Sequence, residues 1–367
     1  MYGYSSRQSD AREFMGNRKR AMEDLGMRVL VTGHDGYIGA VLVPMLQKRG
    51  HEVVGLDNML FRGCDFGKPL CKPDEEMAID VRDIQTEHLQ GIDAVMHLAG
   101  MSNDPAGDLN PDVTYDVNHK ASSRLAEMAK KAGVERFLFS SSCSIYGAQG
   151  NDALDESAEF LPVTPYGESK LYVERDLEKL ADDNFSPTYL RNATAYGVSE
   201  KLRGDLVVNN LTGFAVTTQK VFLKSDGSSW RPLVHIEDIS RAFCAMLEAD
   251  RDVIHNEAFN VGATKENYLI SDVAEIVADV VGCPVTMSDE AFNDIRNYKV
   301  NCDKFESTFP EDRPQWTVRR GVETLLDSMV TNQLTLEQLE GGRFMRLHHL
   351  KQGLESGAIA TDLRVKV

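Results

Sequence analysis

The sequence has no hydrophobic run long enough to cross a bilayer and no surplus of positive charge. A membrane-spanning helix needs about 20 consecutive apolar residues, and no run in the 367 residues approaches that length. The formal net charge is −17, so the average field of the protein would not attract nucleic acids or anionic membranes. We therefore expect neither as a partner. The 42% of hydrophobic residues suffices for a sizeable core.

Cysteine is scarce and scattered as well. The six cysteines form no Cys-x-x-Cys pair, and no histidine cluster has the spacing of metal ligands. These patterns indicate neither a disulfide framework nor a metal site, and they fit a reducing cytoplasm. Residues 1–26 are polar and charged and lack the apolar core of a signal peptide. We predict that they form an N-terminal extension, with the fold beginning at Met27.

A glycine-rich turn lies between a predicted strand and a predicted helix. Residues 29–31 are apolar, residues 32–39 contain three glycines spaced G-x-x-G-x-x-G, and a helical pattern follows. This order suits the diphosphate of a dinucleotide, because the glycines allow a tight turn, close approach to the phosphates and close packing of helix on strand. The predicted contacts are those of Gly33, Gly36, Tyr37, Ile38 and Gly39.

Further cofactor contacts are predicted at later strand ends. Asp57 ends the strand 52–56, roughly 20 residues after the glycines, where a carboxylate accepts both adenosine ribose hydroxyls and repels a 2′-phosphate. NAD is therefore favoured, although Arg62 leaves NADP open. Asp80 either caps its strand or flanks the adenine, and His97 lies within an apolar run as a core histidine would. The residues predicted to bind the cofactor beyond the glycine turn are Asp57, Asn58, Asp80, Val81, Leu98, Ala99, Gly100 and Asn118.

A proton-transfer unit is predicted from three residues. Ser142 lies in a polar segment after the fifth predicted strand, and Tyr166 and Lys170 are four residues apart, hence on one helix face. A nearby ammonium favours the phenolate, so we expect Lys170 to lower the pKa of Tyr166 from its usual value near 10, while Ser142 holds the same substrate oxygen. A Tyr-x-x-x-Lys pair alone is a weak pattern, but after a glycine-rich turn it predicts catalysis beside a nicotinamide.

The order of elements predicts an α/β fold. Apolar strands alternate with helices up to about residue 196, which is typical of a Rossmann-type doubly wound parallel sheet. Beyond that residue, strands and helices no longer alternate regularly, as expected for a smaller lobe. We predict an NAD-binding domain over 27–196, completed by parts of 215–262, a mainly substrate-binding lobe over 197–330 and a helical C-terminal tail over 331–367. The loop 102–108 lies where ligands bind in such sheets, so Ser102 and Asp104 form a predicted substrate wall.

These motifs together resemble the extended short-chain dehydrogenase/reductases, specifically the nucleotide-sugar epimerase/dehydratase branch, over about residues 27–330. The resemblance implies that Tyr166 removes a sugar hydroxyl proton while hydride passes to NAD, giving a 4-keto intermediate. A 4-epimerase returns the hydride to the other face, whereas a 4,6-dehydratase uses an acidic pair after the catalytic Ser or Thr. Those two positions are Cys143 and Ser144 here. A 3,5-epimerase would have cysteine in place of Ser144.

The resemblance therefore favours an NAD-dependent nucleotide-sugar epimerase, commonly a homodimer. A keto-sugar reductase, a 4,6-dehydratase and a non-catalytic dinucleotide-binding protein stay open. Where the family often has an asparagine, this chain has Thr194, so diphosphate contacts are expected from Asn209 or Asn210 instead. Lys201 and Arg203 are equally well explained as solvated loop charges. The predicted substrate residues are Ser102, Asp104, Ser144, Asn192, Asn209, Arg231 and Arg296.

Overall fold

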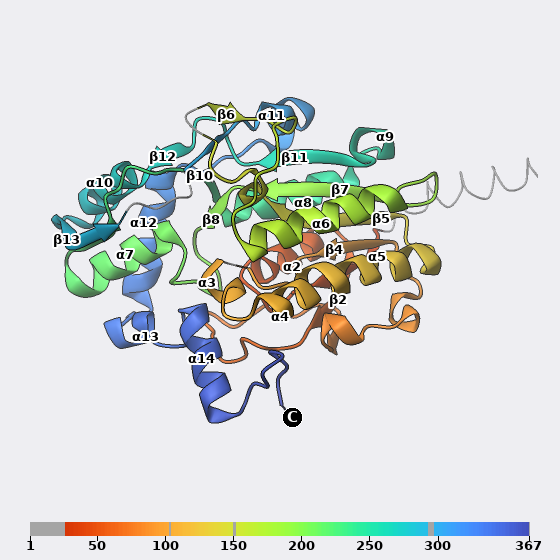
Figure 1. Cartoon of the computed structure of the whole chain (residues 1–367), viewed down its shortest axis with the longest axis horizontal. Helices are drawn as coiled ribbons and strands as arrows, with labels where there is room; N and C mark the ends of the chain where they lie inside the picture. Colours follow the sequence, from red (N-terminus) through yellow and green to blue (C-terminus); the bar gives the residue numbers. More distant parts are fainter. Residues whose placement is uncertain (1–25, 103, 150–151, 293–296, 367) are drawn as a thin grey trace, which may run out of the picture.

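A parallel sheet of seven strands forms the centre of the chain (Figure 1). The computed structural model describes residues 26–102, 104–149, 152–292 and 297–366. The strands lie in the order β11-β7-β5-β4-β1-β2-β3, and each neighbouring pair is parallel. The predicted doubly wound sheet is confirmed. Its strands are β1 Arg28–Thr32, β2 Glu52–Asp57, β3 Glu75–Ala78, β4 Ala94–His97, β5 Arg136–Ser142, β7 Ser186–Asn192 and β11 Glu257–Val261.

Helices cover both faces of this sheet, which is why its central strands are apolar along their whole length. Leu42 and Phe243 pack in the core on one face, and Leu125 and Val173 pack in the core on the other. These residues belong to α2 (Gly39–Lys48), α8 (Ile236–Glu248), α5 (Ala121–Ala132) and α6 (Pro165–Leu180), respectively. The order of strands reverses at β1, which pairs with both β2 and β4, so a crevice opens at the carboxyl ends of these strands.

The helical segment that ends at Gly133 consists of three consecutive pieces. α4 (Pro111–Tyr115) leads into a π-helical turn, η3 (Asp116–Lys120), and α5 then continues to Gly133, which has the left-handed φ of 85° expected at a helix end. Single π-helical turns often mark functional positions. The loop expected over 102–108 also differs, because it contains the one-turn helix α3 (Asp104–Gly107), whose second residue is a proline, as helix starts favour.

The second lobe packs three helices around its own core. α7 (Val207–Thr218), α10 (Ile270–Val281) and α12 (Val318–Thr331) contribute Val208, Val277 and Leu325 to this core. Three small sheets accompany these helices: β8 (Thr194–Tyr196) with β10 (Trp230–His235) and β12 (Asn267–Leu269), β9 (Val221–Ser225) with β13 (Val285–Phe292), and β6 (Ala153–Leu154) with β14 (Lys299–Val300). Short helices α9 (Arg251–Ile254) and α11 (Asp303–Thr308) complete the connections.

The C-terminal segment folds back onto the first domain. It contains α13 (Leu336–Glu340) and α14 (Arg346–Ser356), and α14 lies next to the end of the chain in Figure 1. Leu350 and Leu363 pack against Leu60 and Met101, which follow strands β2 and β4. The predicted helical tail therefore lies beside the strand ends that form the crevice. Among the described helices, none is long and apolar enough to cross a membrane.

Candidate active site

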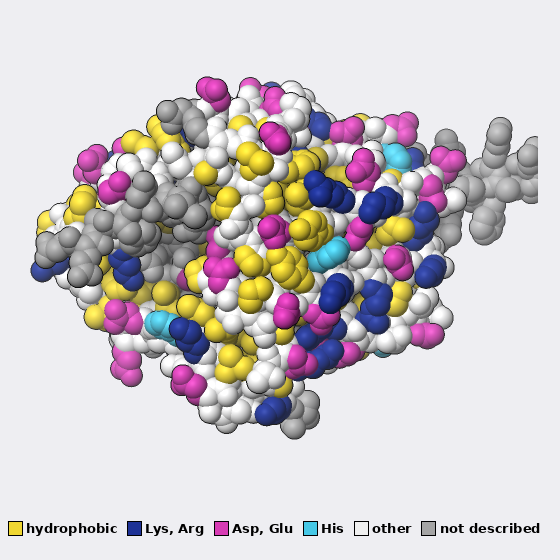
Figure 2. Space-filling model, viewed as in Figure 1, with side chains coloured by type: hydrophobic (Ala, Val, Ile, Leu, Met, Phe, Trp, Pro, Cys, Tyr) yellow, Lys and Arg dark blue, Asp and Glu magenta, His cyan; other side chains and the backbone are white. Residues whose placement is uncertain are grey.

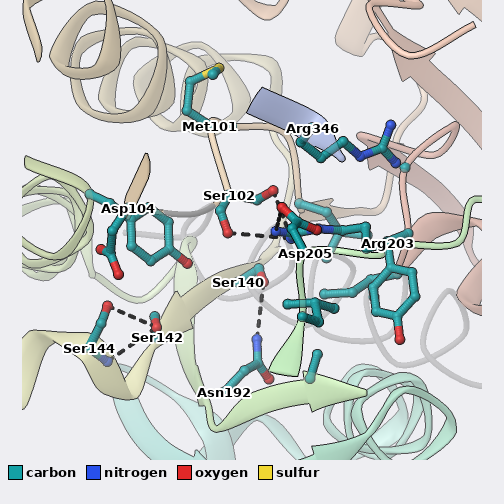
Figure 3. Close-up of a pocket in the computed structure, with 18 of the residues that line it drawn as sticks. Met101, Ser102, Asp104, Ser140, Ser142, Ser144, Asn192, Arg203, Asp205 and Arg346 are labelled. Atoms are coloured by element: carbon teal, nitrogen blue, oxygen red, sulfur yellow. Dashed lines mark hydrogen bonds and ion pairs between the residues drawn. The ribbon is translucent and has the colours of Figure 1, made fainter. Parts of the chain in front are cut away.

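A cavity of about 630 Å³ opens at the carboxyl ends of the central strands. The first domain, the second lobe and the C-terminal segment all contribute walls (Figure 3). Every predicted cofactor, catalytic and substrate residue within the described ranges lines this cavity, apart from Asn118 and Asn209. Arg296 falls outside the described residues. No group of three or more His, Cys, Asp or Glu in the described ranges is placed to hold a metal ion.

The glycine turn has the close contacts that only glycine permits. Gly33 has φ +76°, its N–H donates to the Leu56 carbonyl oxygen at 2.7 Å, and a Cβ there would lie 2.9 Å from the backbone nitrogen of Ala99. A Cβ on Gly39 would lie 2.4 Å from the Gly33 carbonyl oxygen. The turn therefore brings the start of α2 tightly against the sheet, and its backbone N–H groups suit an anion such as a diphosphate.

Asp57 and Asp80 lie at the neighbouring strand ends. The Asp57 carboxylate accepts the backbone N–H of Met59 at 2.8 Å and that of Asp35 at 3.2 Å, while burial raises its pKa. Burial alone would also raise the pKa of Asp80, but the hydrogen bonds and charge of Arg82 outweigh it and the pKa is about 2. Arg82 donates to both Asp80 oxygens, at 2.9 and 2.8 Å. Both carboxylates are therefore fixed in place at the cavity wall.

The end of β4 is held by two buried polar residues. Asn118, in the π-helical turn, accepts the N–H of Met101 at 2.7 Å and donates to its carbonyl at 3.0 Å. Its amide is therefore engaged away from the cavity, so Asn118 positions the backbone beyond Gly100 rather than lining the site. His97 bonds to the hydroxyls of Thr32 at 2.7 Å and Ser122 at 2.6 Å. Burial lowers its pKa to about 3, as expected for a core histidine.

The three predicted catalytic residues converge on one side of the cavity. Ser142 ends β5 and accepts hydrogen bonds from the N–H and hydroxyl of Ser144, at 3.2 and 2.9 Å (Figure 3). Tyr166 and Lys170 lie in the first turns of α6, which Thr164 caps by accepting the N–H of Gly167. The Lys170 ammonium donates to the Ser140 carbonyl at 2.7 Å. The arrangement can pass a proton between a bound hydroxyl, Ser142 and Tyr166.

The pKa of Tyr166 differs from the sequence-based expectation. Burial raises it to about 12, a hydrogen bond with Ser142 lowers it, and the charge of Asp104 raises it. Burial likewise lowers the pKa of Lys170 to about 8. The predicted lowering by Lys170 is therefore not found in this structure, because desolvation of both side chains dominates.

Cys143 points away from the cavity. Its side chain is fully buried, and Sγ lies 3.1 Å from the Arg191 carbonyl oxygen, to which it donates. Burial raises the pKa of its thiol well above the ordinary range. Ser144, the next residue, does line the cavity beside Ser142. Of the two positions where the resemblance places dehydratase acids, one is a buried thiol and the other is a hydroxyl.

Charged residues gather between the catalytic side and the C-terminal wall. Arg203 donates through Nε and Nη2 to the two oxygens of Asp205, each at 2.9 Å, and through Nη1 to the Ser102 hydroxyl at 3.0 Å (Figure 3). Asp104 accepts the Thr164 hydroxyl at 2.7 Å and lies opposite Ser142 and Ser144. Asn192 donates to the Ser140 hydroxyl at 3.1 Å. These groups give one end of the cavity a dense set of polar contacts.

Several sequence-based assignments need correction. Asn209 does not reach the cavity, because its buried amide accepts the N–H of Gly197 at 2.9 Å and donates to the Arg203 carbonyl at 3.0 Å. Asn210 lines the cavity instead. Lys201 and Arg203 are not solvated loop charges, since their side chains are only 2% and 6% exposed. Lys201 lies between the carboxylates of Asp35 and Asp65, at 3.0 and 2.8 Å.

Sequence reasoning missed three arginines of the cavity wall: Arg82, Arg203 as a site residue, and Arg346. Arg82 follows the predicted Asp80 by two positions, so a search for partners of that carboxylate could have found it. Arg203 and Arg346 have no local signal, because their burial depends on contacts between segments far apart in the chain.

The site combines a dinucleotide turn with a Ser-Tyr-Lys set, which defines a dinucleotide-dependent enzyme that moves a proton and a hydride. The chain belongs to the NAD dependent epimerase/dehydratase family, whose model matches residues 29–262. It is 31% identical over 278 residues to a UDP-glucose 4-epimerase of Neisseria meningitidis serogroup C, covering 68% of this chain and 80% of the relative. A UDP-glucose 4-epimerase of Bacillus subtilis is 26% identical over 332 residues, or 82% of this chain and 94% of the relative.

Solved structures agree with this assignment. MoeE5, in complex with UDP-glucuronic acid and NAD, is 26% identical and has a TM-score of 0.72 over 83% of this chain and 99% of its own. The predicted family, the Rossmann-type fold, NAD as cofactor and the class of enzyme, an NAD-dependent nucleotide-sugar epimerase, are thereby confirmed. The glycine turn and the carboxylate of Asp57 fit that cofactor.

Proposed function

We propose that this enzyme inverts C4 of a UDP-activated sugar. The observation that carries the proposal is the grouping of Ser142, Ser144, Tyr166 and Lys170 at one wall, with no carboxylic acid at positions 143 and 144. The relatives named as UDP-glucose 4-epimerases and the UDP-glucuronic acid bound to MoeE5 support a UDP-sugar as the substrate class.

Tyr166 acts as the general base and acid in this proposal. It takes the proton from the sugar 4-hydroxyl, and Ser142 donates a hydrogen bond to the same oxygen. NAD, which the glycine turn and Asp57 would hold, would supply the acceptor for the C4 hydride and the donor for its return to the opposite face of the turned sugar. Lys170 places its positive charge 5.8 Å from the centre of the Tyr166 ring, which stabilises the phenolate during the transfer. Arg203 and Arg231, both cavity residues, are candidates to bind the UDP phosphates.

Elimination of water is the second candidate, and Asp104 is the observation that favours it. This carboxylate lines the cavity and raises the pKa of Tyr166 through its charge, so it lies near the reacting hydroxyl. An acid in that place could protonate a leaving hydroxyl. Its hydrogen bond from Thr164 instead suits a role in orienting the start of α6.

The experiment that separates these reactions is turnover of UDP-glucose, UDP-N-acetylglucosamine and UDP-glucuronic acid in D₂O. Epimerisation by hydride return at C4 gives the C4 epimer with no deuterium on carbon, because the hydride never exchanges with solvent. A dehydratase gives a keto or unsaturated product, and elimination places solvent deuterium on carbon. A reductase needs added NAD(P)H, whereas the epimerase turns over with NAD that stays bound. If the enzyme converts none of these three sugars, the proposal is refuted for them.

We further propose that the enzyme is a homodimer formed through α4, η3, α5 and α6. Hydrophobic side chains gather in the middle of the face shown in Figure 2, over α6 and α4. Tyr115 and Tyr172 stack there with ring centres 6.3 Å apart, and His119 lies 5.4 Å from Tyr172. Aromatic residues of this kind are enriched at interfaces. Light scattering should give twice the mass of one chain for the wild type, and the substitution Tyr172→Glu should shift the measured mass toward that of a single chain. A wild-type protein of one chain mass would refute the dimer.

A further inference from the structure

Arg346 brings the C-terminal segment into the cavity. It is the first residue of α14, its side chain is only 4% exposed, and it lines the cavity on the side away from Ser142 (Figure 3). The carbon at the centre of its guanidinium lies 3.8 Å from the centre of the Phe61 ring. Phe61 lies four residues after Asp57, so Arg346 stacks on the loop that directly follows the predicted ribose carboxylate.

Arg346 has an unsatisfied donor in the cavity wall. Its Nη1 is buried with no hydrogen-bond acceptor, and within the described ranges no carboxylate forms an ion pair with its guanidinium. Burial and the charge of Arg203 lower the pKa of Arg346 to about 10, and the charges of Cys64, Asp205 and Asp57 offset this lowering only in part. It also stands at the start of an 11-residue helix, where the helix dipole is positive and where Met345 provides no side-chain cap. A buried cation in such surroundings is costly unless an anion joins it.

We propose that Arg346 binds the diphosphate of the dinucleotide, so that the C-terminal segment is part of the cofactor site. This inference rests on the proposed function, since it needs the dinucleotide beside the glycine turn. A planar guanidinium with free N–H groups matches phosphate oxygens, and the start of α14 adds favourable dipole. Asp57, at the end of β2 and four residues before Phe61, would repel a 2′-phosphate, which favours the diphosphate as the anion.

The part of the C-terminal segment that follows Arg346 is anchored at the nucleotide side by three contacts. His349 bonds to the Leu60 carbonyl oxygen at 2.8 Å, and Arg82 donates to the Asp362 carbonyl oxygen at 2.8 Å. Arg364 pairs with Asp83. Because Arg82 also holds Asp80, the C-terminal segment and the nucleotide wall share one network. The position of Arg346 is thus fixed before a phosphate arrives, which lowers the entropic cost of binding it.

The test is calorimetric titration of the full-length protein, freed of nucleotide, with ADP-ribose, adenosine, UDP and ADP-ribose 2′-phosphate. Arg346→Met should weaken the binding of ADP-ribose by about 10- to 100-fold and leave the affinities for adenosine and UDP unchanged. The affinity of Arg346→Lys for ADP-ribose should lie between those of the wild type and Arg346→Met, because lysine keeps the positive charge but not the paired N–H donors of the guanidinium. Arg343→Met is the matched control: Arg343 belongs to the same segment but donates to the Asp65 carbonyl oxygen and does not line the cavity.

The other outcomes each contradict the inference. If the variant loses affinity for UDP alone, Arg346 binds the substrate. If it loses affinity for ADP-ribose 2′-phosphate alone, Arg346 binds near the ribose. Unchanged binding of all four ligands would make the arginine structural. Thermal unfolding of nucleotide-free Arg346→Met serves as the second measurement: the melting temperature should be equal or higher, because a buried cation with an unsatisfied donor is removed, and a lower one contradicts the inference. A wild type that binds no ADP-ribose would refute the proposed function itself.

Discussion

The Lys170 ammonium lies 5.8 Å from the centre of the Tyr166 ring while it donates to the carbonyl oxygen of Ser140. No direct hydrogen bond therefore joins the two side chains in this structure, and burial, Ser142 and Asp104 are the main influences on the pKa of Tyr166. Ser142 is the group that hydrogen-bonds with Tyr166. Ser142 thus acts on the tyrosine by hydrogen bonding and Asp104 by its charge, and the two effects can be separated by substitution.

Replacing Tyr166 by Phe removes the proton carrier and leaves the ring in place. We expect turnover to fall by about 10²- to 10⁴-fold, with ADP-ribose binding unchanged, because the adenosine end of the cavity is untouched. Tyr172→Phe is the matched control, since Tyr172 lies on the same helix but does not line the cavity. Initial rates on the accepted UDP-sugar check this. Equal rates for wild type and Tyr166→Phe would remove Tyr166 from the mechanism.

Lys170 should make the stability of the nucleotide-free protein depend on pH. Burial lowers its pKa from 10.5 to about 8, so between these values the unfolded chain holds a proton that the folded chain has lost. Stability therefore rises with pH across this window, by on the order of 3 kcal/mol for full titration, and the gain is absent below pH 8. The pKa of Tyr166 is raised to about 12, so its titration in the folded state lies above the window.

Lys170→Met should abolish that rise. The free energy of unfolding of both proteins is measured in urea from pH 7 to pH 10. Subtracting the value for the variant from that for the wild type cancels the contributions of titrating groups that both proteins contain, and the change of this difference with pH is the effect of Lys170. Below pH 8 the variant should be the more stable, since it carries no buried ammonium. A difference that stays constant across the range would mean that Lys170 keeps an ordinary pKa.

The sequence was sufficient where neighbouring residues decide the structure. The strand, glycine turn and helix around Gly33 and the shared face of Tyr166 and Lys170 follow from spacing over a few positions, and the structure has both. Asn209 shows where this approach ends. It lies one position from Asn210 on α7, and only the packing of Gly197 and Arg203 against it decides which amide reaches the cavity.

Electrostatics were the hardest property to predict. The sequence places Lys170 near Tyr166 but does not reveal how much water the fold excludes, and exclusion of water dominates both pKa values. The burial of Arg346 is equally invisible, because it depends on a segment roughly 285 residues from Phe61 folding back over that ring. Such long-range contacts leave no periodic pattern in the chain.

Asp57 should determine the choice between NAD and NADP. Asp57→Asn removes the charge that repels a 2′-phosphate and keeps the side-chain shape, so we expect the ratio of NADP to NAD affinity to rise by about 10-fold or more. Asp74→Asn is the control, because Asp74 also accepts a backbone N–H near β2, that of Val53, but does not line the cavity. Titration with both dinucleotides checks this. An unchanged ratio would show that Asp57 does not contact the ribose.

Cys143 tests whether position alone gives a residue a catalytic role. It follows Ser142 directly, but its thiol is buried, points to the Arg191 carbonyl oxygen and has a raised pKa. We expect Cys143→Ser to keep turnover within about threefold and to cost about 1 kcal/mol of stability, because a hydroxyl can donate to the same carbonyl but packs less well among apolar neighbours.

Alkylation of the folded protein gives the same information without a substitution. Only the thiolate reacts, so iodoacetamide should label the exposed Cys71 and spare Cys143, as peptide mass mapping would show. Labelling of Cys143 at the rate of Cys71, or loss of turnover in Cys143→Ser with the melting temperature unchanged, would place the thiol in the cavity. That result would favour acid–base chemistry by cysteine over hydride return at C4.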